Sequence, residues 1–464
     1  MDGIESRQER LFGTDGIRGT PGVYPLTDGM IFKIGLSAAK LLLRTGKKDK
    51  NCKIVIGKDT RLSGDRIEII LSDAAKFYSI DVVLAGTIPT PGLSFLVRHL
   101  NADMGVMISA SHNKATDNGI KFFTKGGSKL SPEEESWMEE LLLGSLIHAS
   151  NGQTSKKKGD ISRYPQAANV YKSFLNSTVK DTPLGGLKVV LDCAWGATSG
   201  IAPSLFRELG IDTETIHDIP DGANINLGGA LDPSVLKAKV LEKKADCGFA
   251  FDGDGDRVVL VDEKGNVLDG DYIMAIIGLY LLEKNKLSKD TLVASVMSNY
   301  GLKRALGERG GKLLYTPVGD KYLMEKLIKQ NLNLGGEQSG HIILKEYSIS
   351  PDGMLVALQI LKIIKETKKP LGELAGVMQK LPQILVNVKV KHKKPLHTIP
   401  SLWEAITQSN KKLKNSGRLL VRYSGTEPLA RIMVEGEDER IIEEIALSLR
   451  DIFEKELGIG KTEN

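Results

Sequence analysis

The sequence predicts three related α/β domains with mixed sheets around a central cleft, followed by a smaller C-terminal α+β domain. Two observations predict the repeated part. Three successive stretches share one order of elements, and in each a short apolar strand opens into a polar, glycine-rich loop. Such loops lie at the carboxyl ends of strands, where open α/β sheets bind their ligands. The third observation is a change of pattern after about residue 380, which indicates a separate domain.

The three repeated stretches each contribute loops to the predicted cleft. The strands of the first open into KDTRLSG and SASHN, those of the second into DCAWGATSG and DGDGDR, and those of the third into MSNYG and GGEQSGH. We expect strands at 53–57, 82–85, 104–108, 187–191, 213–216, 248–251, 258–261, 291–296 and 312–316, and a helix near 302–306. A polar, lysine-rich linker at residues 150–160 separates the first two stretches.

The C-terminal stretch combines alternating strands with an amphipathic final helix. We expect strands at 384–390 and 418–422 and helices at 402–409 and 439–456. The predicted domains are 1–158 with the serine loop, 159–258 with an acidic loop, 259–380 with the GGEQSGH loop, and 381–464 with the loop RYSGTEP.

Composition narrows the class of protein. Hydrophobic residues make up 41% and charged residues 26%, which excludes a largely disordered chain. A net charge of +5 over 464 residues, without a long basic stripe, argues against a nucleic-acid partner, and the clusters at 156–158 and 391–394 are typical of solvated surface. The three cysteines lack CxxC spacing, the N-terminus lacks a signal peptide, and the longest apolar stretch, 272–282, is too short to span a membrane. These features predict a cytoplasmic protein with reduced thiols.

The loop DGDGDR is the clearest candidate for a metal site. Asp252, Asp254 and Asp256 alternate along an extended chain, so their carboxylates lie on one side. Oxygen ligands of this kind favour Mg²⁺. An EF-hand does not fit, because Arg257 stands where that loop requires glycine and strands flank the segment. A solvated acidic turn is the remaining alternative.

Three other loops allow two interpretations each. Ser111 follows a buried-looking strand and could project into the cleft, although serine is common in loops. Arg422 and Arg431 flank hydroxyls and a glycine in a pattern suited to phosphate, or they form a surface turn with a local ion pair. Glu337 and Ser339 could bind sugar hydroxyls or cap a helix.

Taken together, these motifs resemble the α-D-phosphohexomutase family over nearly the whole chain. The matching segments, in order, are LFGTDGIRG (11–19), ISASHN (108–113), DNGIKF (117–122), DGDGDR (252–257), MSNYGL (297–302), VGDKY (318–322), GGEQSGH (335–341) and RYSGTEPLARIMVEG (422–436). Each motif alone is modest evidence, whereas their correct order along the chain is specific.

The resemblance implies a phosphosugar mutase in which Ser111 is the phosphoserine. Its implied metal set is Asp252, Asp254 and Asp256 with an oxygen of that phosphoserine, holding one Mg²⁺ per chain. The implied catalytic residues besides Ser111 are Lys121 as general acid or base, His112, Arg18 and Arg257. The implied substrate-binding residues are Glu337, Ser339, Lys321, Arg422, Ser424, Gly425, Thr426 and Arg431.

The resemblance also implies a phosphosugar substrate, a hexose or hexosamine 1,6-bisphosphate primer, no membrane partner, and a monomer or homodimer. GEQSGH and RYSGTEP favour glucosamine 6-phosphate and glucosamine 1-phosphate as the interconverted pair. Lys114, Lys321 and the segment 226–233 depart from the family's usual residues. They leave open glucose or mannose phosphates as substrates. A non-catalytic sugar-phosphate binding protein is the alternative from another class, and the presence of Ser111, Lys121 and the three aspartates argues against it.

Overall fold

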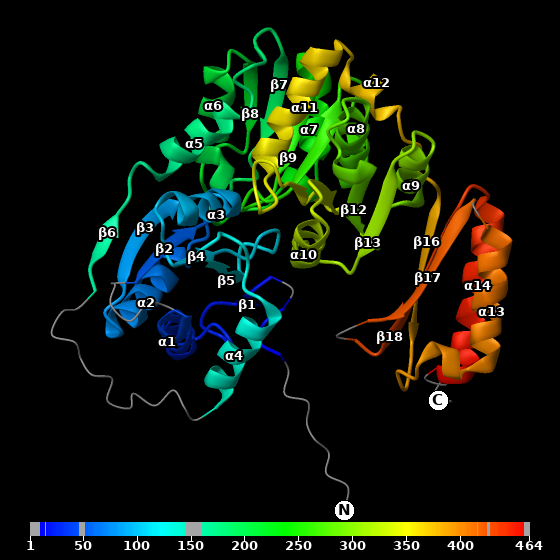
Figure 1. Ribbon diagram of the computed structural model, residues 1–464, viewed down its shortest axis with the longest axis horizontal. Coiled ribbons are helices and arrows are strands. Elements are labelled where there is room, and N and C mark those ends of the chain that lie inside the picture. Colours follow the sequence, from blue (N-terminus) through cyan, green and yellow to red (C-terminus); the bar gives the residue numbers. More distant parts are fainter. Residues whose placement is uncertain are drawn as a thin grey trace, which may run out of the picture. The chain divides into compact units, whose positions relative to one another are not determined.

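The computed structural model describes residues 10–13, 15–45, 52–144, 159–414, 416–424 and 427–458. The chain forms two compact units, of which the first comprises Met1–Met297 with Gly310–Val377 and the second Ser298–Arg309 with Met378–Asn464 (Figure 1). The first unit contains three mixed sheets, and the second contains one antiparallel sheet.

The three sheets of the first unit share one topology, which confirms the predicted repeat and fold class. A central strand pairs in parallel with two neighbours, and the second neighbour pairs with an antiparallel strand. The central strands are β2 (Lys53–Lys58), β7 (Lys188–Asp192) and β12 (Thr291–Ser295). Their parallel neighbours are β3 (Asp81–Thr87) and β4 (Met104–Ile108), β8 (Asp212–Ile216) and β9 (Cys247–Phe251), and β13 (Lys312–Thr316) and β14 (Leu334–Gly336). The antiparallel strands are β5 (Asn118–Thr124), β10 (Val258–Asp262) and β15 (Ile342–Leu344).

Three short strands extend these sheets. β1 (Ile17–Gly19) pairs with β5, β6 (Ile161–Arg163) pairs with β3, and β11 (Val267–Leu268) pairs with β10. Sheet membership therefore places β6 with the first domain and all of β10 and β11 with the second. The domain ends expected at residues 158 and 258 lie just before β6 and at the first residue of β10.

Helices cover both faces of the first sheet, because its central strand is apolar on both sides. Ile54 and Ile56 of β2 share one buried cluster with α1 (Asp28–Thr45) and α2 (Gly64–Phe77). Gly57 points to the opposite face, where a Cβ would lie 3.3 Å from Leu93 of α3 (Thr90–His99). α4 (Pro132–Leu143) follows β5 and begins with a capping box of Ser131 and Glu134.

The remaining helices of the first unit belong to the second and third repeats. They are α5 (Ala167–Ser177), α6 (Ala202–Glu208), α7 (Ser234–Lys243), α8 (Gly270–Glu283), α10 (Asp320–Gln330), α11 (Gly353–Thr367) and α12 (Leu371–Ala375), with short 3-10 turns at Ala197–Gly200, Gly229–Leu231 and Ser288–Asp290. A buried hydrogen bond of 2.8 Å from the Tyr171 hydroxyl to Asp352 joins α5 to the N-cap of α11. This contact ties the second repeat to the third.

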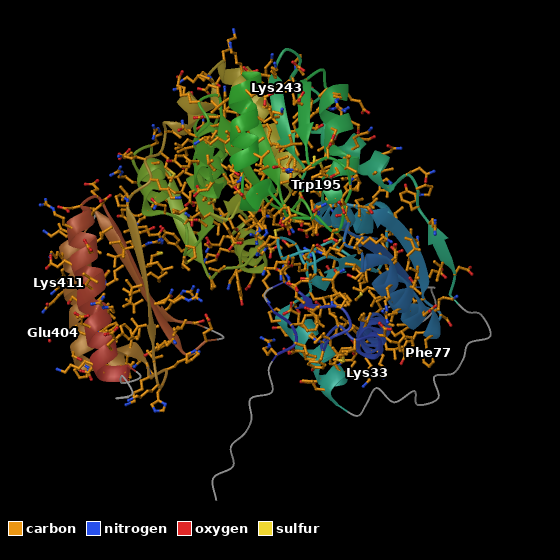
Figure 2. The ribbon with its side chains drawn as sticks, turned by 180° about the vertical axis from the view of Figure 1, so that it is seen from behind. Lys33, Phe77, Trp195, Lys243, Glu404 and Lys411 are labelled. Carbon is orange, nitrogen blue, oxygen red and sulfur yellow. The ribbon has the colours of Figure 1, made fainter. Side chains whose placement is uncertain are left out.

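The second unit is a three-stranded antiparallel sheet with two long helices on it. Its strands, in the order β16 (Gln383–Lys389), β18 (Leu429–Gly436) and β17 (Gly417–Tyr423), are covered by α13 (Pro400–Leu413) and α14 (Glu439–Leu457). α13 buries Leu402 and Ile406, whereas Glu404 and Lys411 lie on its exposed face (Figure 2). The unit also includes α9 (Tyr300–Gly307) and a 3-10 turn at Leu396–Thr398.

All three cysteines are buried and free, which confirms the expectation of unpaired thiols. Among the described helices none combines the length and the apolar character needed to cross a membrane.

Candidate active site

Ser111 lies in a buried turn directly after β4, at the carboxyl end of the strand. Its side chain is 1% exposed, and its hydroxyl donates a hydrogen bond of 2.9 Å to Asp252. The backbone of Ser111 has φ of 52°, a left-handed conformation that is unusual for a residue with a side chain. The surrounding contacts must therefore hold this serine in place.

Arg61, in the loop after β2, holds the serine turn through several hydrogen bonds. Its guanidinium donates to the carbonyl oxygens of Ser111 at 2.9 Å and Asn113 at 2.8 Å, and it also bonds those of Lys114 and Asp117. Asp59 accepts a 3.0 Å bond from Arg61 and so fixes the guanidinium. Five N–H donors in a rigid fork suit arginine to gathering several carbonyl groups.

Asn226 also holds the serine turn, a role that the motifs of the sequence do not indicate. Its amide donates to the carbonyl oxygens of Ser111 at 2.8 Å and Asn113 at 3.0 Å, while its own oxygen accepts 2.8 Å from the backbone N–H of Gly253. Asn226 also has a positive φ of 65°, which asparagine tolerates better than most residues. One side chain thus connects the serine turn to the acidic loop.

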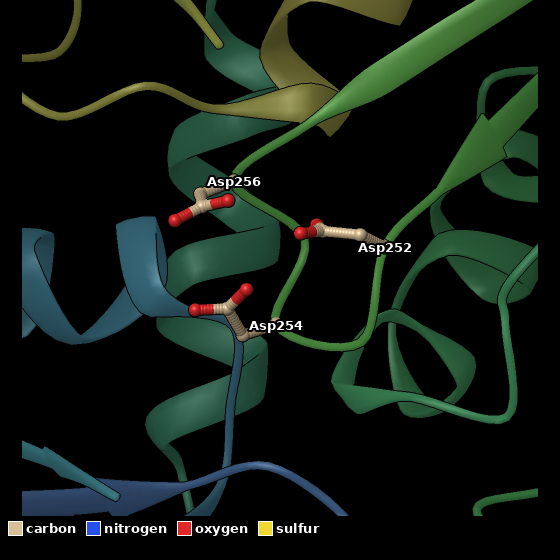
Figure 3. Close-up of side chains that lie close together, drawn as sticks. All are labelled: Asp252, Asp254 and Asp256. Atoms are coloured by element: carbon tan, nitrogen blue, oxygen red, sulfur yellow. The ribbon is translucent and has the colours of Figure 1, made fainter. Parts of the chain in front are cut away.

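The three aspartates of the acidic loop converge in the structure (Figure 3). Asp252, Asp254 and Asp256 are buried, and one oxygen of each lies within 4.8 Å of the others. The loop joins the antiparallel strands β9 and β10, which brings the carboxylates together on one side. Burial and the carboxylates of Asp256 and Asp254 raise the pKa of Asp252 to about 8.

This carboxylate cluster fits a divalent cation. The Oδ1 atom of Asp254 is buried and has no hydrogen-bond partner among the described residues, while its Oδ2 accepts bonds from Thr90 and Lys121. An unpaired buried carboxylate oxygen is costly, and oxygen-only donors suit Mg²⁺. The geometry therefore favours a metal site over a solvated acidic turn.

Lys121 lies in β5 with its amino group among carboxylates. Its Nζ is 2.7 Å from Asp15, 2.8 Å from Asp254 and 3.5 Å from Asp256. Although burial opposes it, these carboxylates hold the pKa of Lys121 well above its usual range. In the structure Lys121 is therefore an ammonium ion, fixed beside the three aspartates.

Arg18 and His112 lie next to this group. Arg18 donates 2.7 Å to Asp15 and 3.1 Å to the side chain of Asn113, so it is anchored against the serine turn. His112 has its Nδ1 atom 3.5 Å from the Ser111 hydroxyl. Burial, Arg257 and Arg18 lower the pKa of His112 to about 4, which leaves a neutral imidazole at neutral pH.

Glu337 and His341 connect the GGEQSGH loop to the acidic loop. His341 lies 3.0 Å from Glu337 through Nδ1 and 3.0 Å from Asp256 through Nε2. Against the effect of burial, Asp256 and Glu337 raise the pKa of His341 to about 10. The second oxygen of Glu337 accepts a 2.9 Å bond from the backbone N–H of Gly319.

Three other predicted site residues of the first unit, Arg257, Ser339 and Lys321, differ in how they relate to the three aspartates. Arg257 has its Nε 3.8 Å from Asp252, and Ser339 is exposed on its loop. Lys321 pairs with Glu135 of α4 at 3.1 Å and lines a cavity of about 430 Å³ beside that helix. The contacts of Lys321 therefore connect it to α4, whereas Glu337 is connected to the acidic loop through His341.

The second unit contains a candidate phosphate site of its own. Arg422 of β17 and Arg431 of β18 are direct cross-strand partners, and like charges in that position destabilise a sheet unless an anion joins them. Arg431 also forms an ion pair with Glu427 at 3.0 Å, so the local ion pair of the alternative interpretation is present as well. The Nε atom of Arg431 is buried without a partner among the described residues. The carbonyl oxygen of Ser424 accepts 2.6 Å from Lys393, a residue we expected only as solvated surface. Gly425 and Thr426 lie outside the described residues.

The chain belongs to the phosphoglucomutase/phosphomannomutase family. Models of that family's alpha/beta/alpha domains I, II and III match residues 9–145, 168–265 and 269–381, and the model of its C-terminal domain matches 385–452. The family resemblance noted from the motifs is thereby confirmed.

Relatives of nearly the same length carry a more specific name. The phosphoglucosamine mutase of Syntrophotalea carbinolica is 45% identical over 460 residues, covering 98% of this chain and all of the relative. That of Geobacter sp. strain M21 is 47% identical over 452 residues, covering 97% of this chain and 99% of the relative. The crystal structure of a phosphoglucomutase/phosphomannomutase family protein from Burkholderia thailandensis has the same fold, with a TM-score of 0.77 at 22% identity over 95% of this chain and 97% of that one.

Proposed function

We propose that this protein is a phosphoglucosamine mutase, which interconverts glucosamine 6-phosphate and glucosamine 1-phosphate. One observation carries the proposal: the Ser111 hydroxyl is hydrogen-bonded to one member of a buried cluster of three carboxylates. A serine placed there suits reversible storage of a phosphoryl group. The full-length relatives named phosphoglucosamine mutase support the choice of the amino sugar.

Asp252, Asp254 and Asp256 would hold one Mg²⁺, together with an oxygen of phosphorylated Ser111. When bound, the cation would neutralise charge on the phosphoryl group, which is the main requirement of phosphoryl transfer. The Oδ1 atom of Asp254 supports this assignment, because it is a buried carboxylate oxygen that accepts no hydrogen bond from the described residues and can therefore be a metal ligand.

The remaining residues of the first unit would position the reacting groups. In the first transfer the bond between phosphorus and the Ser111 oxygen breaks, a bond to one sugar oxygen forms, and that sugar hydroxyl loses its proton. In the second transfer the bond between phosphorus and the other sugar oxygen breaks, the bond to Ser111 forms again, and the released sugar oxygen takes up a proton. Lys121 would be the general acid or base: its neutral form would accept the proton of the sugar hydroxyl, and the ammonium form present here would give it back to the released sugar oxygen. Arg18, His112 and Arg257 would steady the phosphoryl oxygens.

The substrate would be held at both ends. Glu337 and Ser339, with Lys321 nearby, would bind sugar hydroxyls, and the phosphate that is not being transferred would bind Arg422, Ser424, Gly425, Thr426 and Arg431. The opposed arginines of β17 and β18 support the phosphate assignment, since a phosphate can join both guanidinium groups, whereas the ion pair with Glu427 involves Arg431. The bisphosphate formed after the first transfer would donate from its other end, and a hexose or hexosamine 1,6-bisphosphate would prime Ser111.

We further infer a cytoplasmic enzyme that acts as a monomer or homodimer. The unpaired buried cysteines support a reducing compartment.

The test is a ³¹P NMR time course with Mg²⁺, a trace of glucose 1,6-bisphosphate, and glucosamine, glucose and mannose 6-phosphates at equal concentrations. The glucosamine 1-phosphate signal should grow fastest. A leading hexose 1-phosphate would instead indicate a phosphoglucomutase or phosphomannomutase. No product from any sugar, together with a Ser111 that gains no phosphate by intact mass, would indicate a binding protein.

A further inference from the structure

β5 and the turn after it place two lysines on one face of the sheet. Lys121 and Phe123 are two residues apart in β5, so their side chains point the same way. Hydrogen bonds of 2.7 Å from Thr124 to Ser128 and from Gly127 to Thr124 close the turn. The chain returns with Lys129 directly opposite Phe123, and cross-strand partners share a face. Lys129 therefore lies on the same side as Lys121.

Lys129 connects two carboxylates from different parts of the first unit. Its amino group forms an ion pair with Asp15, which also bonds Lys121 and Arg18 at 2.7 Å each. On the other side Lys129 lies 2.6 Å from Asp320, the first residue of α10. The side chains of Lys129 and Asp320 are only 14% and 7% exposed. Carboxylates buried to this degree require a cation nearby.

The link through Lys129 completes a closed circuit of contacts. Asp320 follows Gly319, whose N–H holds Glu337, and Glu337 holds His341. His341 contacts Asp256, which lies near Lys121, and Lys121 returns to Asp15. Within the described residues the circuit joins the acidic loop, the GGEQSGH loop, the VGDKY loop and β5.

We propose that Lys129 is a positioning residue for sugar recognition. Its ammonium group holds the VGDKY loop at a fixed distance from Lys121 and Asp15. Because the Gly319 N–H of this loop bonds Glu337, the same contact fixes the position of Glu337. The inference depends on the proposed function, because it takes Glu337 as the group that binds the sugar. Loss of the ammonium charge leaves Asp320 without its cation and releases the loop that carries Gly319.

The test compares three variants with a matched control on the same turn. Lys129→Met removes the charge but keeps most of the length, Lys129→Arg keeps the charge, and Asp320→Asn removes the partner. Lys125→Met is the control, because Lys125 is 62% exposed and forms its ion pair with Asp103, at 3.5 Å, which takes no part in the circuit. Measurements are kcat and KM for the preferred sugar phosphate, and hydrogen exchange of the peptide that contains residues 317–323.

We expect Lys129→Met to raise KM about tenfold and to lower kcat less than threefold, with faster exchange in that peptide. Asp320→Asn should shift KM in the same direction, and the double variant should be no worse than Lys129→Met alone. Lys129→Arg should restore KM to within twofold of the wild type, and Lys125→Met should change nothing.

Two results would overturn the inference. One is an unchanged KM in Lys129→Met, with or without a loss in kcat. The other is a shift of KM in Lys125→Met as large as in Lys129→Met. If Lys129→Met does not fold, Asp320→Asn and Lys129→Arg decide by the same criteria. Failure of the proposed function is distinguishable, because the wild-type protein itself would then turn over no sugar phosphate.

Discussion

The contacts of Asn226 lead to a prediction that separates positioning from stability. Asn226→Gly removes the side-chain amide and still allows the positive φ of 65°, so the backbone is not strained. The amide nitrogen of Asn226 packs closely on Gly253, since a Cβ built on Gly253 would lie 2.9 Å from it. Removal of the amide therefore opens a small space at Gly253 and creates no clash. The substitution therefore deletes the connection between the serine turn and the acidic loop with little other change.

The expected cost follows from the three hydrogen bonds that are lost. The carbonyl oxygens of Ser111 and Asn113 keep their bonds from Arg61, so each loses only one of two partners. The N–H of Gly253 loses the bond it makes to the side chain, which costs about 1–3 kcal/mol. With the two weaker losses and the flexibility of glycine, the free energy of unfolding should fall by about 2–4 kcal/mol.

Activity should fall further than stability alone explains. Ser111 would lose one restraint on a left-handed backbone, and a displacement of about 1 Å at a reacting atom can cost roughly 100-fold in rate. We expect kcat to fall 10- to 100-fold under conditions where the variant is fully folded. Urea unfolding gives the stability, and intact mass spectrometry gives the rate at which Ser111 accepts phosphate from glucose 1,6-bisphosphate.

Two further variants serve as controls. Asn224→Ala lies in the same loop, and its amide bonds Asp221 at 2.6 Å, so it should leave the phosphorylation of Ser111 within twofold of the wild type. Asn226→Asp keeps an acceptor for the Gly253 N–H but places an oxygen against two carbonyl oxygens, so it should slow Ser111 phosphorylation at least as much as the glycine. The reasoning fails if Asn226→Gly loses stability while Ser111 is phosphorylated at the wild-type rate.

Three other predictions concern single side chains. Ser111→Ala should abolish turnover and the phosphate-dependent mass shift while leaving the melting temperature within a few degrees, and retained turnover would contradict the serine assignment. Asp254→Asn should weaken Mg²⁺ activation at least tenfold, and an unchanged titration would argue against the metal loop. Burial raises the pKa of Asp352 to about 6, so its contribution to stability is present below about pH 4 and is lost as pH rises through 6. The difference of about 2 pKa units corresponds to about 3 kcal/mol, and Asp352→Asn should remove that part of the decline between pH 4 and 7.5 in urea unfolding, whereas identical pH profiles would refute it.

Most of the fold could be predicted because, in each repeat, a short stretch of sequence contains the apolar strand and the polar loop that follows it. The strand Met104–Ile108 is apolar throughout and ends in a polar loop, so its bounds are readable from the sequence, and the structure has the same bounds. The sequence analysis does not include β5 among the expected strands, although its segment NGIKFFT has apolar residues on both sides of Lys121. A buried lysine interrupts the apolar pattern there, and only its carboxylate partners from other segments make that position tolerable.

The opposed arginines could have been predicted in more detail than they were. Tyr423 pairs with Ala430, so the loop between β17 and β18 is short, and a hairpin of that length places Arg422 opposite Arg431. The same reasoning applies to the turn TKGGSK, which returns Lys129 to a position opposite Phe123. In both cases the signal is the register of a hairpin, which loop length largely determines.

The role of Asn226 has a different origin, and no local pattern predicts it. Its partners Ser111 and Asn113 are 115 and 113 residues away in the sequence and belong to another repeat. The contact exists because the first two sheets pack so that the loop after β8 meets the loop after β4, and that packing depends on the whole interface. Residues that react can thus be found from motifs, because their chemistry restricts the residue type. Residues that position them are restricted only by shape and hydrogen bonding, so they become visible when the neighbouring domain is in place.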